Sequence, residues 1–81
     1  MDWIKKIIEI KEKLSDNGYR NSLDKITNAQ MIFGTTGEMY LEVMNVLLII
    51  KQTNLPELVL IEKDIDELLK YGNDIGYFVL E

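Results

Sequence analysis

Residues 54–72, NLPELVLIEKDIDELLKYG, carry the strongest structural pattern in the sequence. Apolar residues and one glycine recur there at intervals of 3, 4, 3 and 4, which places them on one face of an α-helix. These positions are Leu58, Ile61, Ile65, Leu68 and Gly72. Asn54 is predicted to cap this helix, with Pro56 in the first turn and Glu57 bonding back to the cap. The segment therefore predicts a long amphipathic helix with one buried face.

Two more helices are predicted upstream. Apolar residues at helical spacing cover residues 2–14, with Asp2 as the N-cap, and an Asp-Asn-Gly sequence then favours a helix end. A second, shorter pattern covers residues 23–33, and Asn21 or Ser22 is expected to cap it. Both patterns put their apolar residues on one side of a helix, as an element of a bundle requires.

A further helix is predicted to begin after the glycines and threonines of residues 32–43, IFGTTGEMYLEV. Thr35 and Glu38 have the spacing of a capping box. This loop lacks the lysine of a phosphate-binding loop and places Glu38 where an anion would be repelled, so we interpret it as a hinge between helices. Residues 39–50 are almost entirely apolar, which is typical of a central helix. A buried strand over residues 46–50 is the alternative.

The fold expected from these patterns is an all-α, small antiparallel bundle of three to four helices, formed by residues 1–81 as a single domain. The tail, residues 72–81, leaves two alternatives open. The last helix either continues through Gly72 and Gly76 with a bend or ends at Gly72, because glycine is unfavourable in a helix interior.

The composition limits the chemistry of the chain. It has no histidine and no cysteine, which removes the usual general base, zinc ligands and activated nucleophile. We therefore expect no enzyme activity, no catalytic residues, no metal and no cofactor. The net charge is −5, which argues against nucleic acid as a partner. Residues 1–25 carry six bases and five acids, whereas residues 26–81 carry three bases and nine acids, so the acidity is concentrated in the second part.

The sequence shows no pattern for a membrane or a secretory route. Its most apolar run, residues 46–50, is far shorter than the roughly 20 residues that span a bilayer. The first residues lack the apolar region and the cleavage site of a signal peptide. We therefore expect a cytoplasmic protein that does not bind membranes.

Acidic residues cluster on the helix predicted for residues 54–72. They are Glu62, Asp64, Asp66 and Glu67. Lys63 stands four residues before Glu67, and Lys70 four residues after Asp66, which is the spacing of ion pairs along a helix. We interpret this cluster as a solvated helix face.

Two tyrosines lie beside this acidic segment. Tyr71 and Tyr77 flank Asp74, and aromatic side chains among charges are frequent at the centres of protein interfaces. The alternative is that both tyrosines simply cover one end of the bundle.

Residues 34–77 resemble small bacterial all-helical proteins of the immunity type, in which a glycine or serine and a glutamate open an apolar helix and an L-x-x-L-x-x-x-I-x-x-L-x-x-Y-type helix follows. The matching positions are Gly37, Glu38, Leu41, Leu47, Leu58, Ile61, Ile65, Leu68, Tyr71 and Ile75. The resemblance implies a non-catalytic protein that neutralises a basic toxin by binding it. An acidic surface would steer that encounter. The partner-binding residues expected on this basis are Glu62, Asp66, Glu67, Tyr71, Asp74 and Tyr77.

The alternative function is a structural or regulatory homodimer. An 81-residue chain without disulfides has a small core, and a second copy could extend it. The surface expected to be buried in such a dimer is part of the apolar helix over residues 39–50 or the sequence IGYFVL at residues 75–80.

Overall fold

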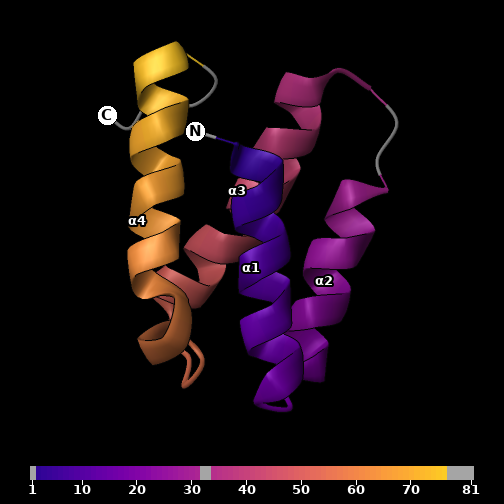
Figure 1. The fold of residues 1–81 in the computed structure, drawn as a ribbon, viewed down its shortest axis with the longest axis vertical. Helices are drawn as coiled ribbons and strands as arrows, with labels where there is room; N and C mark the ends of the chain where they lie inside the picture. The colour runs from indigo at the N-terminus through magenta and orange to yellow at the C-terminus, as the bar shows by residue number, and fades with distance from the viewer. Residues whose placement is uncertain (1, 32–33, 77–81) are drawn as a thin grey trace.

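A computed structural model describes residues 2–31 and 34–76 of the chain as four α-helices (Figure 1). They are α1 (Trp3–Asp16), α2 (Arg20–Gln30), α3 (Thr36–Gln52) and α4 (Leu58–Ile75). Successive helices alternate in direction and pack side by side, and α4 returns to lie beside α1. This confirms the predicted all-α antiparallel bundle. Residues 46–50 lie inside α3, so the strand alternative is wrong.

The core draws apolar side chains from all four helices. In α4 the predicted face is confirmed, since Ile61, Ile65 and Leu68 are fully buried and Leu58 is nearly so. Burial of each large side chain contributes about 1.5–3 kcal/mol to stability, because its apolar surface is removed from water. The edge of Trp3 from α1 meets the ring of Tyr40 from α3, with centroids 5.4 Å apart and planes at 88°. This aromatic pair joins two helices that lie diagonally across the bundle.

Two of the predicted helix starts are confirmed. A side-chain oxygen of Asp2 accepts a hydrogen bond from the N–H of Lys5 at 3.1 Å and caps α1. The hydroxyl of Thr35 accepts from the N–H of Glu38 at 3.1 Å and caps α3. Both caps satisfy N–H groups that have no partner within the helix.

The start of α2 differs from the prediction. The helix begins at Arg20, three residues before the predicted position, and neither Asn21 nor Ser22 caps it. Gly18 adopts φ +79°, and the N–H of Tyr19 bonds to a carbonyl in the last turn of α1, so the chain reverses at once. The first turn of α2 thus forms directly from the turn that ends α1. Position 33, the predicted end of this helix, lies outside the described residues.

The predicted capping box at Asn54 and Glu57 is also wrong. Asn54 adopts φ +52°, and its N–H bonds to the carbonyl of Lys51, so this residue terminates α3 rather than starting α4. Helix α4 begins at Leu58, and Glu57 is buried beneath it with 6% of its surface exposed. Asparagine tolerates the left-handed conformation well, which explains its place at a helix end.

Of the two alternatives for the end of α4, the structure shows the continuation through Gly72. The helix ends at Ile75, and Gly76 closes it with φ +77°. Gly72 is buried against α3, and a Cβ at this position would lie 2.7 Å from Cε1 of Tyr40 and overlap its hydroxyl. The glycine is therefore required for the close approach of α3 and α4.

Candidate functional site

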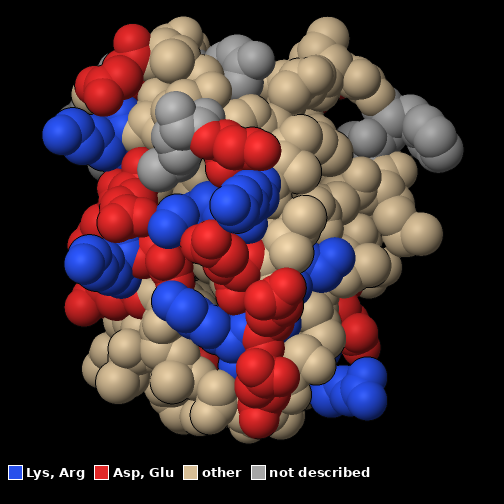
Figure 2. All heavy atoms as spheres, in the orientation of Figure 1, with Lys and Arg blue, Asp and Glu red and all other residues tan. Residues whose placement is uncertain are grey.

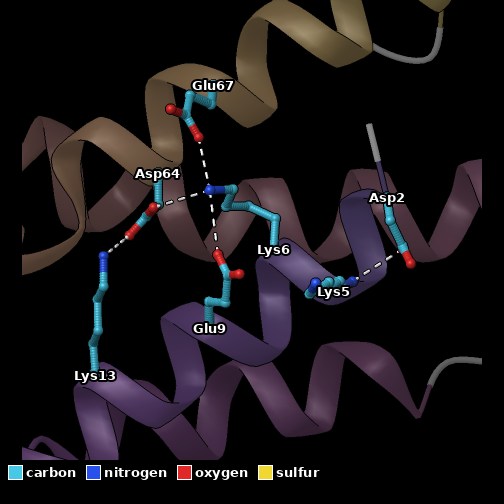
Figure 3. A network of polar contacts seen from close by, with 7 residues as sticks. All are labelled: Asp2, Lys5, Lys6, Glu9, Lys13, Asp64 and Glu67. Atoms are coloured by element: carbon cyan, nitrogen blue, oxygen red, sulfur yellow. Dashed lines mark hydrogen bonds and ion pairs between the residues drawn. The ribbon is translucent and has the colours of Figure 1, made fainter.

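A network of charged side chains joins α1 to α4 (Figure 3). The ammonium of Lys6 lies among three carboxylates, at 2.7 Å from Glu67, 3.3 Å from Glu9 and 3.4 Å from Asp64. Lys13 approaches Asp64 from the other side at 2.6 Å. The hydrogen bond that Lys6 donates to Glu67, together with those to Glu9 and Asp64, raises the pKa of Lys6 above its usual value, although burial opposes the shift. Lys6 is therefore the hub of the contact between these helices.

Asp64 differs from the solvated residue that the sequence predicted. Its side chain is 8% exposed and accepts hydrogen bonds from two lysines of α1. The expected pairs within α4 are replaced by pairs to other helices, since Asp66 bonds to Lys51 of α3 and Glu67 to Lys6 of α1. The acidic run thus holds α4 against both of its neighbours, rather than forming one solvated face.

The structure divides the predicted partner-binding residues between two sides of α4. Residues of an α-helix are about 100° apart, so Glu62 and Asp66 share the side that faces α3. Both are exposed, and the carboxylate of Asp66 pairs with Lys51. Tyr77 lies outside the described residues.

The other side of α4 brings three of the predicted residues together. Glu67, Tyr71 and Asp74 are spaced 4 and 3 residues apart and, with Lys70, line a recess of ≈ 280 Å³. Tyr71 is half-buried and packs against the core, whereas Asp74 and Lys70 are exposed. Glu67 reaches the edge of the recess from its ion pair with Lys6. These residues form the α4 recess.

Described residues line two further hollows elsewhere on the molecule. One, of ≈ 220 Å³, is lined by residues 18–22 and by Glu57, whose carboxylate accepts a hydrogen bond from the hydroxyl of Ser22. The other is a small apolar groove of ≈ 50 Å³ between α2 and α3, where Ile49 is 56% exposed. The sequence did not predict the burial of Glu57, because its spacing from Asn54 indicated a capping residue at a helix start.

The charge on the face made by α1 and α4 is mixed. Figure 2 shows acidic and basic side chains interleaved over these two helices, while the upper right of the same view carries few charges. The network around Lys6 accounts for part of this mixing, since it brings two lysines and three carboxylates together. Acidic side chains outside these pairs, such as Asp74 in the α4 recess, are also exposed to solvent.

The described residues constrain the chemistry of the site. Across residues 2–31 and 34–76, no three acidic side chains converge as a group that could hold a metal ion. No helix in the same part of the chain is both long and apolar enough to cross a membrane. Comparisons with protein-family models, curated proteins and solved structures gave no match to this chain. The candidate function therefore rests on the residues of the α4 recess and on the charge of the molecule.

Proposed function

We propose that this chain is a non-catalytic protein-binding module, and that the α4 recess is the centre of the surface with which it binds a basic protein. The observation that carries the proposal is the convergence of Glu67, Tyr71 and Asp74 on one recess. A half-buried tyrosine offers a large apolar ring and a polar tip at a small loss of conformational entropy. Residues of this kind supply much of the binding free energy in protein interfaces.

Electrostatics favours a basic partner. The chain carries a net charge of −5, and a field of this sign attracts cations over distances of up to about one Debye length. Asp74 is exposed at the edge of the recess, where it is free to meet a lysine or arginine of the partner. The sequence resemblance to immunity-type proteins implies that the partner is a basic toxin, which this chain would neutralise by binding it.

Two pairs of substitutions distinguish the sides of α4. Tyr71→Ala with Asp74→Lys changes the recess, and Glu62→Lys with Asp66→Lys changes the opposite side. Each tagged variant and the wild type would be used to capture proteins from an extract of the source cell, with the retained proteins identified by mass spectrometry. We expect the wild type and the Glu62→Lys, Asp66→Lys variant to retain the same basic protein. The Tyr71→Ala, Asp74→Lys variant should not retain it.

Retention of that protein by the recess pair would contradict the proposal. If only the Glu62→Lys, Asp66→Lys variant failed to retain that protein, the binding surface would be on the side of α4 that faces α3. Circular dichroism of every variant checks that the helices remain folded, so that a loss of binding is a property of the surface.

A second candidate function is the homodimer, which one observation favours. Ile49 of α3 is 56% exposed and lies at the rim of the apolar groove with Val46 and Leu55. A second copy that packs there would remove this surface from water. Sedimentation equilibrium at micromolar concentration tests the homodimer. We expect the wild type to be a dimer and Ile49→Asp to dissociate it, whereas a wild-type monomer of 9.4 kDa would contradict this function.

A further inference from the structure

The end of α4 has few contacts of its own with the core. Beyond Leu69, Gly72 is the one buried residue of the helix, Tyr71 is half-buried, and residues 73–76 are all exposed. A last turn with three exposed residues and one glycine is expected to open readily. Yet this turn presents Tyr71 and Asp74 to the α4 recess, so its position decides the shape of that recess.

One side chain from α3 reaches into this region. Tyr40 is fully buried, and its hydroxyl donates a hydrogen bond to the carbonyl of Leu68. The same side chain has a backbone hydrogen bond with Gly72. In an α-helix, the N–H of residue 72 and the carbonyl of residue 68 belong to the same step of the hydrogen-bond ladder. Tyr40 therefore contacts both backbone groups of a single step of α4.

We infer that Tyr40 is a positioning residue for the α4 recess, whose hydroxyl holds the last turn of α4 in place, and that Gly72 is the residue that admits it. The inference rests on the proposed function, which assigns partner binding to the α4 recess. The geometry supports it independently, because a Cβ on Gly72 would lie 2.7 Å from Cε1 of Tyr40 and closer still to its Cζ and hydroxyl oxygen. A side chain that enters a helix ladder fixes the local course of the helix.

Amide hydrogen exchange tests the inference on the protein alone, without a partner. Tyr40→Phe keeps the ring against Trp3 and removes only the hydroxyl. We expect the amides of residues 72–75 to exchange about tenfold faster, relative to those of residues 61–65, because the hydroxyl no longer bonds to the helix. Ile26→Val in α2 is the control for a general loss of stability, and it should leave the ratio between the two regions unchanged.

A second comparison separates positioning from helix propensity. Alanine is the better helix former, so propensity alone predicts that Gly72→Ala slows exchange in the last turn. Our inference predicts the opposite, since the added methyl group displaces the turn from Tyr40. Asn73→Ala, at the exposed neighbouring position, is the matched control and should slow exchange or leave it unchanged. Tyr40→Leu combined with Gly72→Ala should restore part of the lost protection, because the smaller side chain leaves room for the methyl group.

An unchanged exchange ratio in Tyr40→Phe would overturn the inference, as would slower exchange of residues 72–75 in Gly72→Ala. The ring resonances of Tyr71 provide a second readout, and they should shift in Tyr40→Phe and stay unchanged in Ile26→Val. These results are independent of partner capture. A failure here leaves the proposed binding surface standing, and a failure of capture leaves the role of Tyr40 in the fold unaffected.

Discussion

Replacement of Lys6 by methionine is the most informative single change to the contact between α1 and α4. Methionine keeps most of the apolar stem and removes the ammonium that lies among Glu9, Asp64 and Glu67. Three carboxylates then remain close together, and Lys13 is the one lysine left in the described network. Among these carboxylates Asp64 is the most affected, because its side chain is only 8% exposed.

The expected loss of stability follows from the exposure of each partner. Glu9 and Glu67 are 44% and 39% exposed, so their pairs with Lys6 contribute about 0–1 kcal/mol each. The hydrogen bond to buried Asp64 joins charged groups and contributes about 1.5 kcal/mol, at the low end for its length of 3.4 Å. The total is about 1.5–3.5 kcal/mol, which corresponds to a fall in Tm of roughly 6–28 °C for a domain of this size.

Urea unfolding followed by circular dichroism measures this loss, with the slope of the transition compared between variants. Lys5→Met is the matched control, since Lys5 is exposed on the same helix and its substitution removes the same charge. We expect that control to change the free energy of unfolding by less than about 0.5 kcal/mol. Equal effects of the two substitutions would refute the role of Lys6 as the hub of the network.

Three further predictions concern the fold. Ser22→Ala should cost about 1–3 kcal/mol, since it leaves the buried carboxylate of Glu57 without this hydroxyl, and thermal unfolding measures the loss. Thr35→Ala should cost about 1 kcal/mol through loss of the α3 cap, and urea unfolding that shows no change would contradict the observed bond. The unfolding free energy should fall as the pH rises above about 10, because two groups have raised pKa values in the folded state. The pKa of Lys6 is raised by its hydrogen bonds to Glu67 and neighbouring carboxylates, and that of Tyr40 is raised by burial in the core. Their contributions are complete below the unfolded-state values near 10 and are lost as the pH climbs toward the folded-state values, so Tyr40→Phe should show a smaller alkaline loss than the wild type.

The elements predicted best from the sequence are those determined by neighbouring residues. The spacing of Leu58, Ile61, Ile65 and Leu68 predicted the buried face of α4, since a helix repeats every 3.6 residues. The cap at Thr35 was likewise predictable, because its partner stands three residues away. Patterns of this kind require no knowledge of the rest of the chain.

Contacts between distant residues were beyond sequence reasoning. Lys6 and Asp64 are 58 positions apart, and no local pattern indicates that an acid in a charged run will be buried against a lysine of another helix. At Asn54 two local rules competed, because the same residue type favours helix starts and left-handed helix ends. The structure shows the helix end there, and the buried hydrogen bond between Glu57 and Ser22 fixes the following loop against α2.

The candidate site was predictable in part. The sequence indicated the residues of α4, and the structure shows that Glu67, Tyr71 and Asp74 share a recess while Glu62 and Asp66 lie on the other side. The division into two sides follows from the helical spacing, whereas the helix that lies beside each side, α1 at Glu67 and α3 at Asp66, depends on the packing of the bundle.

The central claim is that the α4 recess binds a basic protein, and calorimetric titration of the captured partner tests it most directly. We predict that Tyr71→Ala weakens binding by at least about 2 kcal/mol, roughly thirtyfold, as expected of an aromatic anchor at the centre of an interface. Glu62→Gln, on the opposite side of α4, should change the affinity by less than threefold, within about 0.6 kcal/mol. Equal affinities of the wild type and Tyr71→Ala, in a variant with unchanged helical content, would contradict the account.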